Sequence, residues 1–555
     1  MDINLRIAGE AGQGLVAVGN LLVGAAAAAG LEVFSGKSYL SRIRGGLNWC
    51  DLRFADHPVF GLKERPELLL ALNSTALDLL REHTAPGAVI LLDGKQDRPQ
   101  TLTVDFTGIA KQNGGADIMG NTVAAGTIWG MLGYPLEILE NELRQEFAGH
   151  DQIIAQNLAC AAAGYQKGLT LTPRTNPPQP VREPGTVMTG AAMIGLAAAT
   201  SGVKFVTAYP MTPGTATLNY LAAAADRYGI VVEQAEDEIA AVNMLCGATY
   251  AGVPAMTTTS GGGFALMAEG LALAGMMELP IFILVAQRPG PATGMPTRTA
   301  QEDLKFAINA GHGEFLRIVY APGTHQQCGE LTRTALVTAH RFQVPAIMLT
   351  DQYLQDAETN SAMPDAEYRP VNRALTGDAP AAYVRYADSP DGVSPRAIPG
   401  GGVAVVSDSD EHDEAGHLTE DFAARIRQQQ KRLRKNAGLL NCFIMPEIFG
   451  DGDAEVALLC WGSTYGACRE YVETVNRNGG NKVAMIHFSQ LWPLPGDRLK
   501  PLLERPRRLI AVEGNVTGQL RSLLREAGIS REISGVNRYD GLPITAEFLF
   551  SEVKL

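Results

Sequence analysis

Cysteine is scarce in this chain of 555 residues and shows no pairing pattern. The seven cysteines are scattered, and Cys460 and Cys468 lie nearest to each other. An odd number without a Cys-x-x-Cys pair argues against a disulfide framework and predicts a reducing, cytoplasmic compartment. The spacing also matches no usual ligand set for an iron-sulfur cluster. Any such cluster that works with this chain is therefore expected on a partner.

Basic runs and uninterrupted apolar segments are also missing. The formal net charge is -13, and without a cluster of Lys and Arg this argues against nucleic acid as a partner. Three charge-free stretches approach the length of a membrane span, but Ala, Gly, Ser and Thr dominate them, so buried α/β helices explain them better. These stretches are Leu15 to Leu31, Thr186 to Val203 and Gly247 to Ala268. The first residues also lack the basic and apolar regions of a signal peptide.

The chain is too long for one hydrophobic core, and its composition favours layered α/β domains. Hydrophobic residues make up 46% and charged residues 19%, which is typical of well-buried sheets and helices. The pattern predicts domains at residues 1–170, 185–356 and 455–555, with a linker at 171–184. Residues 357–454 are expected to form an irregular connecting region. Its charged helix, Glu420 to Lys435, is predicted to be solvated.

A glycine-rich turn follows the first apolar strand. Ile3 to Ala8 leads into Gly9-Glu10-Ala11-Gly12-Gln13-Gly14 and then into a helix, Leu15 to Ala29. The spacing differs from the dinucleotide fingerprint, and no acidic residue follows at the usual distance. Gly12 and Gly14 would let an anion approach the helix amides, although a plain tight turn also explains them. A reductase that binds a dinucleotide at this turn is one alternative.

A later series of strand exits carries residues suited to chemistry. Val203 to Ala208 is an apolar run that ends in the loop Tyr209-Pro210-Met211-Thr212-Pro213-Gly214-Thr215. Open α/β sheets bind ligands at such exits, and the two prolines stiffen the loop around the Thr212 hydroxyl. Glu238 enters an almost wholly apolar helix, so its carboxyl must be paired or functional. Arg298 lies on the loop after a third apolar strand, Ile281 to Val285.

Together these segments resemble the pyrimidine-binding half of the 2-oxoacid:ferredoxin oxidoreductases, which are thiamine diphosphate enzymes. Met211, Gly214 and Thr215 depart from the usual Tyr-Pro-Ile-Thr-Pro-Ser-Ser, and Ala191 replaces the asparagine of the usual Gly-Asn-Glu-Ala. The match rests on Tyr-Pro-Met-Thr-Pro at 209–213, Glu-Asp-Glu-Ile-Ala-Ala at 236–241, Thr-Gly-Met-Pro-Thr-Arg-Thr at 293–299 and Gly-His-Gly-Glu-Phe at 311–315.

The resemblance extends to both ends of the chain. Residues 1–170 resemble the gamma module of the family, which is a separate subunit in some members and is fused here. Residues 455–555 resemble the C-terminal domain of transketolase-like enzymes. The implied fold is a multidomain α/β protein, with a Rossmann-like gamma domain, a thiamine diphosphate pyrimidine-binding fold and a transketolase C-terminal-like domain.

The resemblance also implies a role for individual residues. Glu238 is expected to face N1′ of thiamine diphosphate, where the aminopyrimidine needs a carboxylate, and Tyr209, Pro210 and Thr212 to line the cofactor site. Thr212 and Arg298 are expected to bind the substrate, because a guanidinium offers two parallel donors to a carboxylate. Candidate contacts to coenzyme A or another anion are Gly12, Gly14, Lys37, Arg42 and Arg44.

The implied activity is that of an alpha subunit, which decarboxylates a 2-oxoacid oxidatively, uses coenzyme A and reduces ferredoxin. The leading substrate is 2-oxoglutarate. No metal ligand is expected in this chain, so a beta subunit is expected to supply Mg²⁺ and a [4Fe-4S] cluster in a dimer of alpha-beta heterodimers without membrane contact. The alternatives are a pyruvate, branched-chain or aromatic 2-oxoacid member, and a non-redox transketolase-like enzyme that would share Glu238.

Overall fold

The computed structural model describes residues 2–40, 45–96, 98–171, 180–183, 185–361, 366–376, 383–479 and 482–555. The chain forms two compact units. The first comprises Met1–Met188 and Ala357–Met363, and the second comprises Thr189–Asp356 and Pro364–Leu555.

A mixed eight-stranded sheet forms the centre of the first unit. Its strands are β1 (Asp2–Ala11), β2 (Glu32–Ser38), β3 (Gly45–Ala55), β4 (Leu68–Ala71), β5 (Val89–Asp93), β6 (Leu102–Val104), β7 (Met188–Thr189) and β14 (Glu358–Thr359). They are ordered β6-β5-β4-β1-β3-β2-β14-β7. The strands β1, β4, β5 and β6 run parallel, whereas β3 pairs antiparallel with both β1 and β2. The predicted first strand and the α/β character are confirmed.

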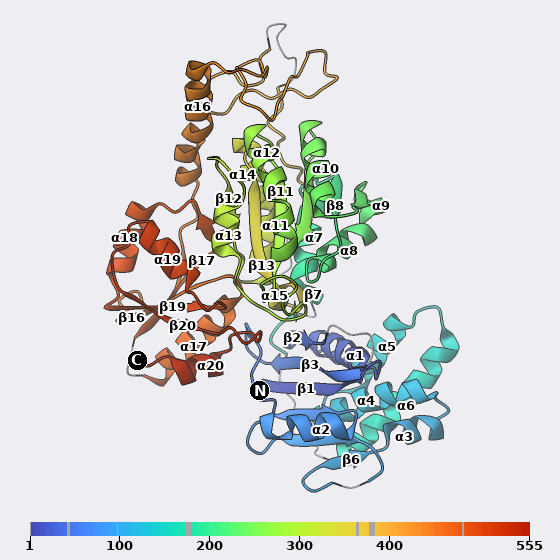
Figure 1. Ribbon diagram of the computed structural model, residues 1–555. Coiled ribbons are helices and arrows are strands. Elements are labelled where there is room, and N and C mark those ends of the chain that lie inside the picture. The colour runs from blue at the N-terminus through green and yellow to red at the C-terminus, as the bar shows by residue number, and fades with distance from the viewer. Residues whose placement is uncertain are drawn as a thin grey trace. The chain divides into compact units, whose positions relative to one another are not determined.

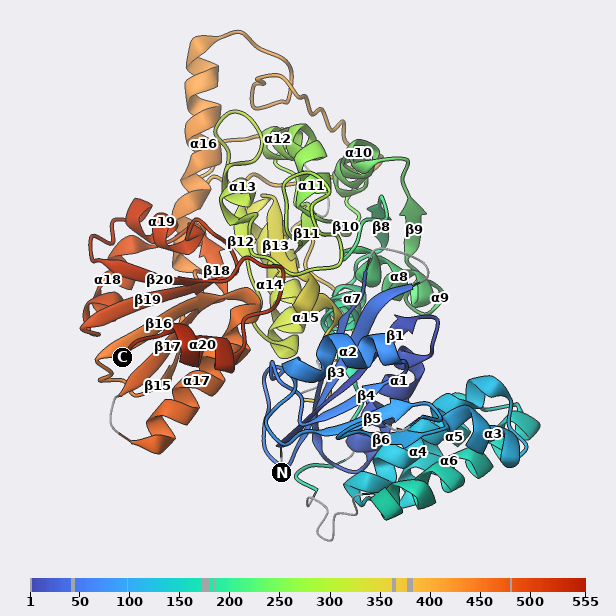
Figure 2. The same ribbon diagram turned by 60° about the horizontal axis from the view of Figure 1, so that its bottom comes forward.

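Helices cover both faces of this sheet. They are α1 (Leu15–Ala28), α2 (Ser74–Leu80), α3 (Phe106–Gln112), α4 (Gly120–Leu132), α5 (Leu136–Glu146) and α6 (Asp151–Leu171), with short 3-10 turns at Arg81–His83 and Asp117–Met119. Leu5 and Ile7 point into the core shared with α1 and α4, whereas Ala8 packs toward α2. Helices α4 and α6 lie side by side (Figure 2). A Cβ at Gly164 would stand 2.1 Å from the Val123 carbonyl oxygen, so only glycine permits this approach.

A distant segment completes the first unit. Asn360 accepts a hydrogen bond from the Val33 amide at 3.0 Å and donates to the Leu31 carbonyl at 2.7 Å. Glu358 lies in β14, antiparallel to β2. The sequence pattern placed these residues in the connecting region, because their pairing with β2 depends on residues more than three hundred positions earlier.

The second unit contains a seven-stranded sheet in the order β18-β12-β13-β11-β10-β8-β9. Figure 1 labels β8, β11, β12 and β13 of this sheet, and Figure 2 labels all of its strands. The strands are β8 (Phe205–Ala208), β9 (Val231–Gln234), β10 (Ala255–Thr259), β11 (Phe282–Gln287), β12 (Ile318–Tyr320), β13 (Ala346–Asp351) and β18 (Gln490–Trp492). All run parallel except β18, which pairs antiparallel with β12. The apolar runs predicted as strands at 203–208 and 281–285 correspond to β8 and β11.

The helices around this sheet form two groups. They are α7 (Gly190–Thr200), α8 (Thr215–Ala223), α9 (Ala225–Tyr228), α10 (Glu238–Tyr250), α11 (Gly261–Leu266), α12 (Ala268–Met276), α13 (Leu304–Asn309), α14 (His325–Phe342) and α15 (Gln352–Asp356). Helix α7 contacts α8 and α14, whereas α10 contacts α11 and α12. The helix that follows β8 is α8, which belongs to the group of α7 and α14. The helix that follows β10 is α11, which belongs to the group of α10 and α12.

A five-stranded sheet forms the C-terminal part of the second unit, in the order β15-β17-β16-β19-β20. The strands are β15 (Glu447–Gly450), β16 (Val456–Trp461), β17 (Val483–Phe488), β19 (Arg508–Glu513) and β20 (Ile533–Asn537). The helices are a 3-10 turn η3 (Gly462–Thr464), α17 (Tyr465–Asn478), α18 (Gly496–Glu504), α19 (Gln519–Glu526) and α20 (Ala546–Glu552). Only β15 is antiparallel to its neighbour. Within the described residues, no helix has both the length and the apolar character that a membrane crossing requires.

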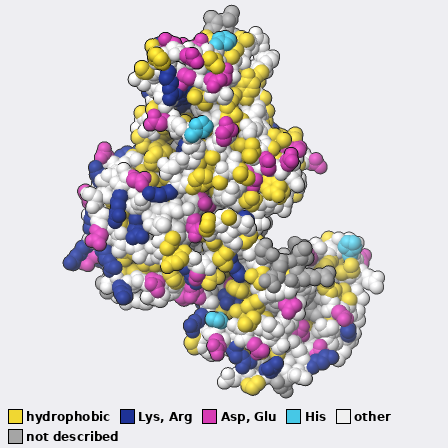
Figure 3. Space-filling model, in the orientation of Figure 1, with side chains coloured by type: hydrophobic (Ala, Val, Ile, Leu, Met, Phe, Trp, Pro, Cys, Tyr) yellow, Lys and Arg dark blue, Asp and Glu magenta, His cyan; other side chains and the backbone are white. Residues whose placement is uncertain are grey.

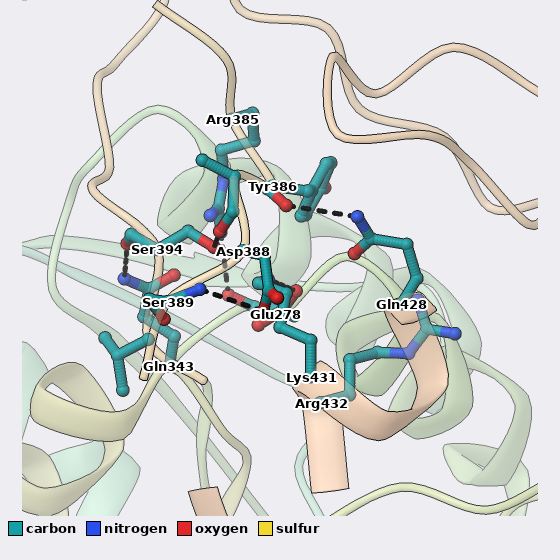
Figure 4. A network of polar contacts seen from close by, with 12 residues as sticks. Glu278, Gln343, Arg385, Tyr386, Asp388, Ser389, Ser394, Gln428, Lys431 and Arg432 are labelled. Atoms are coloured by element: carbon teal, nitrogen blue, oxygen red, sulfur yellow. Dashed lines mark hydrogen bonds and ion pairs between the residues drawn. The ribbon is translucent and has the colours of Figure 1, made fainter. Parts of the chain in front are cut away.

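The connecting helix α16 (Phe422–Asn441), predicted to be solvated, is exposed on one face and buried on the other. Lys431 and Lys435 are fully buried and form ion pairs with the buried carboxylate of Glu278 (Figure 4), at 2.6 Å in the case of Lys431. Burial lowers the pKa of Lys435 to about 8, against the opposing effect of Glu278. The two lysines lower the pKa of Glu278 far enough to outweigh its burial. The face that carries these lysines is therefore packed into the second unit.

This network gives a stability prediction. Glu278→Gln should lower the free energy of unfolding by about 3–5 kcal/mol, because two buried ammonium groups would lose the carboxylate that they share. The matched control is Glu414→Gln, which removes the half-exposed partner of Arg427 on the same helix and should change stability by no more than about 1 kcal/mol. Denaturant unfolding of both variants measures the difference, and equal effects would contradict the role given to Glu278.

Candidate functional site

The candidate site lies at the carboxyl ends of β8, β9, β10 and β11. Strands β8 and β10 are neighbours in the sheet, and the chain leaves them toward opposite groups of helices. Ligands in open α/β folds bind at such a switch point, because the diverging connections leave a crevice between the strand ends. The loops after these strands carry Thr212, Glu238 and Arg288.

The loop after β8 is held in place from several sides. Arg288 donates a 2.6 Å hydrogen bond from Nη1 to the Thr212 carbonyl oxygen, and Thr258 donates to the carbonyl oxygen of Gly214 at 3.0 Å. A Cβ at Gly214 would stand 2.7 Å from the Thr258 hydroxyl and 2.9 Å from the Thr259 carbonyl oxygen. This crowding explains why glycine stands where the family pattern has serine. Thr212 is half-buried and Tyr209 is 40% exposed.

Glu238 is the first residue of α10 and is buried, with 3% exposure. The side chain of Asp237 caps the helix by accepting a 2.7 Å hydrogen bond from the Ala240 amide. In the described part of the chain, Oε1 of Glu238 has no hydrogen-bond partner. An unpaired buried carboxyl oxygen is unfavourable unless a ligand supplies a donor. The position therefore suits a hydrogen-bond donor of a bound cofactor, such as a protonated ring nitrogen or an amino group.

The turn after β10 makes room for this carboxyl group. A Cβ at Gly263 would stand 2.4 Å from Oε1 of Glu238 and 2.1 Å from Oγ1 of Thr259. Ser260 precedes this glycine turn and donates its hydroxyl to the Met211 sulfur at 2.7 Å. The run Ser260-Gly261-Gly262-Gly263, directly after the buried strand β10, is a sequence signal that the predicted motifs do not include.

Asp303 is a second buried carboxyl near this turn. Its oxygen atoms would stand 2.3 and 2.4 Å from a Cβ at Gly261, and Oδ2 has no hydrogen-bond partner among the described residues. Burial, with a smaller contribution from Glu302, raises the pKa of Asp303 to about 6 against the opposing charge of Arg288. The sequence gives no clear signal for this group, because an Asp before a helix is ordinarily a cap and its side chain makes no cap bond here.

Arg298 lies on the loop between β11 and α13 and packs against the C-terminal domain. A Cβ at Gly541 would stand 3.1 Å from the Arg298 Cβ, and the Thr299 amide donates to the Gly541 carbonyl at 3.2 Å. The side chain is half-buried, and burial lowers the pKa of its guanidinium. The structure thus links Thr212 to Arg288 by a hydrogen bond, and it places Arg298 on a loop that packs against the C-terminal domain.

The predicted anion residues of the first unit have different surroundings. Gly12 and Gly14 both have positive φ values, 95° and 85°, and Gly14 is the N-cap residue of α1. The side chain of Gln13 closes the turn by accepting a 2.7 Å hydrogen bond from the Glu10 amide. Lys37 forms a 2.9 Å ion pair with Glu358, so an anion there would compete with a carboxylate. Arg42 and Arg44 lie outside the described residues.

Two family models match the chain. One is described as pyruvate ferredoxin/flavodoxin oxidoreductase and matches residues 4–167. The other is described as pyruvate flavodoxin/ferredoxin oxidoreductase, thiamine diphosphate-binding, and matches residues 196–431. The second match covers the strand exits that carry Thr212, Glu238 and Arg298. The fold and these matches define a subunit of an α/β oxidoreductase with a thiamine diphosphate-binding domain.

Relatives match along nearly the whole chain. The alpha subunit of 2-oxoacid:ferredoxin oxidoreductase 2 from Aeropyrum pernix is 30% identical over 98% of this chain and 96% of its own. The 2-oxoglutarate oxidoreductase subunit KorA of Mycobacterium tuberculosis is 27% identical over 98% and 90%. A solved 2-oxoglutarate:ferredoxin oxidoreductase from Magnetococcus marinus, with 2-oxoglutarate, coenzyme A and succinyl-CoA bound, has a TM-score of 0.92 at 30% identity and covers 99% of this chain and 98% of that one. The chain belongs to the 2-oxoacid:ferredoxin oxidoreductase family.

The glycine turn provides a test of the site. Gly263→Ala should displace the Glu238 carboxyl group and lower the turnover of the assembled enzyme by roughly tenfold or more, since small displacements at a reacting centre are costly. Gly262→Ala is the matched control, because its Cβ would lie an ordinary 3.5 Å from the Ala292 carbonyl oxygen. Acceptor reduction with a 2-oxoacid measures both variants. Full activity in Gly263→Ala would show that this turn does not position Glu238 for turnover.

Proposed function

We propose that this chain is the alpha subunit of an enzyme that oxidatively decarboxylates a 2-oxoacid, with 2-oxoglutarate as the leading substrate, and transfers electrons to ferredoxin. The observation that carries the proposal is the buried Glu238 oxygen without a partner at a switch point. When bound, thiamine diphosphate supplies a nucleophilic carbon and an electron sink. Glu238 accepts a hydrogen bond from N1′ and holds the proton there, while Tyr209 and Pro210 lie beside the cofactor.

Two further residues of this unit bind the substrate. The Arg298 guanidinium pairs with the carboxylate of the 2-oxoacid through two parallel donors. The Thr212 hydroxyl hydrogen-bonds a substrate oxygen, and Arg288 fixes its loop through the Thr212 carbonyl. The 2-oxoglutarate choice is supported by relatives with that substrate in their names and by the bound 2-oxoglutarate of the similar structure. Pyruvate and branched-chain or aromatic 2-oxoacids are the alternatives within the family.

A second subunit completes the site in this proposal. It supplies Mg²⁺, the diphosphate contacts and a [4Fe-4S] cluster, since the cysteines of this chain lack cluster spacing. Apolar side chains on the segments that follow the strand exits support such a partner, because they are 40–50% exposed and would be covered by it. These are Tyr209, Ile239, Met244, Leu266 and Met295.

The remaining proposals concern assembly and coenzyme A. The active form is a dimer of alpha-beta heterodimers in the cytoplasm, with ferredoxin as a transient partner. Coenzyme A contacts the first unit near the Gly12 and Gly14 turn, with Lys37, Arg42 and Arg44 as further candidates. On the face that Figure 3 shows, acidic and basic side chains are interspersed, in keeping with a protein that does not bind nucleic acid.

Replacement of the central carboxylate tests the function. In the complex of this chain with its co-purifying subunit, Glu238→Gln should lower 2-oxoglutarate-dependent reduction of ferredoxin by roughly 10² or more, because an amide cannot hold the N1′ proton in the same way. Circular dichroism should show an unchanged fold, since glutamine has the same shape. Near-normal turnover would overturn the role of Glu238, and a wild-type complex that consumes 2-oxoacid without reducing the acceptor would overturn the redox assignment.

Replacement of the substrate arginine tests specificity. Arg298→Lys keeps the positive charge but loses the paired donors. We expect kcat/KM for 2-oxoglutarate to fall by a factor corresponding to about 1.5–3 kcal/mol, the value of a hydrogen bond to a charged group. The dissociation constant of thiamine diphosphate should change little. A variant that loses the cofactor but keeps its substrate affinity after reconstitution would move the substrate role to another residue such as Arg288.

A further inference from the structure

The C-terminal sheet has a switch point of its own. Strands β16 and β19 are parallel neighbours. After β16 the chain passes through α17 to β17 on one side, and after β19 it passes through α19 to β20 on the other. Their carboxyl ends, at Trp461 and Glu513, therefore border the kind of crevice in which open α/β sheets bind a ligand.

This crevice is occupied by Gln301 from the Arg298 loop. Gln301 is 2% exposed, and all four of its hydrogen-bonding groups have partners in the C-terminal domain. Its side chain donates to the Trp461 carbonyl at 2.7 Å and accepts from the Gly514 amide at 2.8 Å. Its own amide donates to the Gly514 carbonyl at 2.7 Å, and its carbonyl accepts from Asn515 Nδ2 at 2.9 Å.

The walls of the crevice are built to receive this side chain. Gly514 has no side chain, and a Cβ there would stand 3.3 Å from Cγ of Gln301. Glu513 is fully buried beneath it and holds the rim in place, because Oε2 accepts hydrogen bonds from Trp461 Nε1 at 3.3 Å, Asn515 Nδ2 at 3.0 Å and the Leu520 amide at 2.8 Å. One buried carboxylate thus holds Asn515 Nδ2, which also binds Gln301, and the side chain of Trp461, whose carbonyl accepts from Gln301.

The contact extends toward Arg298. The Thr299 amide donates to the Gly541 carbonyl, and Gly541 lies on the loop after β20, the strand beside β19. Loops after three neighbouring strands of the C-terminal sheet thus hold residues 299–301. Arg298 immediately precedes this segment and packs directly on Gly541.

We propose that Gln301 is a positioning residue, through which the crevice of the C-terminal domain sets the position of the Arg298 guanidinium for substrate binding. This inference rests on the substrate role proposed for Arg298. It gives the C-terminal domain a part in substrate affinity, exerted through the loop that it holds.

Two matched substitutions separate this role from general stabilisation. Gln301→Glu keeps the acceptor for the Gly514 amide but loses the donor to the Trp461 carbonyl. Gln519→Glu makes the same chemical change at the far end of the segment, where Gln519 accepts from the Lys305 amide at 2.8 Å and donates to the Glu302 carbonyl at 2.6 Å. Both are measured in the complex with the co-purifying subunit, together with the melting temperature of each.

We expect Gln301→Glu to raise KM for 2-oxoglutarate roughly tenfold, with a smaller effect on kcat and none on thiamine diphosphate affinity, because the guanidinium is misplaced rather than lost. Gln519→Glu should leave KM within about twofold of wild type. Combined with Arg298→Lys, the Gln301→Glu effect should be smaller than in the wild-type background, since both changes act on one interaction. Gln301→Met removes both side-chain bonds without adding a charge and carries the same expectations, so it separates a misplaced guanidinium from competition by the new carboxylate. It also replaces the glutamate variant if that variant does not assemble.

The outcomes distinguish this inference from the substrate role of Arg298 on which it rests. A raised KM in Arg298→Lys with an unchanged KM in Gln301→Glu would overturn the inference alone. Equal increases of KM in Gln301→Glu and Gln519→Glu would also overturn it. So would a double variant in which the KM increase equals the product of the increases in Gln301→Glu and Arg298→Lys. An unchanged KM and kcat in Arg298→Lys would overturn the substrate role itself.

Discussion

One buried carboxyl oxygen sets the constraint on which the site of the second unit depends. Oε1 of Glu238 is removed from water and has no hydrogen-bond partner in the described part of the chain. Such a group costs stability that the rest of the unit must supply, and a ligand that donates a hydrogen bond recovers the lost interaction. Gly263 and the cap by Asp237 keep the carboxyl at one position. The surrounding packing therefore serves to fix one acceptor in space.

The segment between β11 and α13 links three parts of the second unit. At its start, Arg288 reaches the Thr212 carbonyl. Near its end, Gln301 enters the C-terminal crevice, and Asp303 lies against Gly261. A loop held at several points has few conformations to lose, so the groups it carries are in place before a ligand arrives.

The sequence predicted those elements that follow from a pattern of neighbouring residues. The strands β8 and β11 follow from apolar runs, and the burial of Glu238 follows from the apolar helix that it begins. The prediction that α16 is solvated was wrong for one face of the helix, because Lys431 on that face is buried in an ion pair with a residue 153 positions away. The contacts of the Gln301 side chain could not be predicted for the same reason, because the crevice that binds it is formed by residues more than 150 positions later in the chain.

The two networks of the second unit differ in what they hold together. The ion pairs of Glu278 fix the connecting helix through buried charge, which is strongly destabilising to break but provides no free group for chemistry. The hydrogen bonds of Gln301 are made by uncharged groups, so residue 301 anchors the loop without a charged side chain of its own. A neighbouring buried carboxylate would compete with a substrate carboxylate for the guanidinium, whereas an amide does not. The anchor at Gln301 thus adds no carboxylate of its own that would compete for the Arg298 guanidinium.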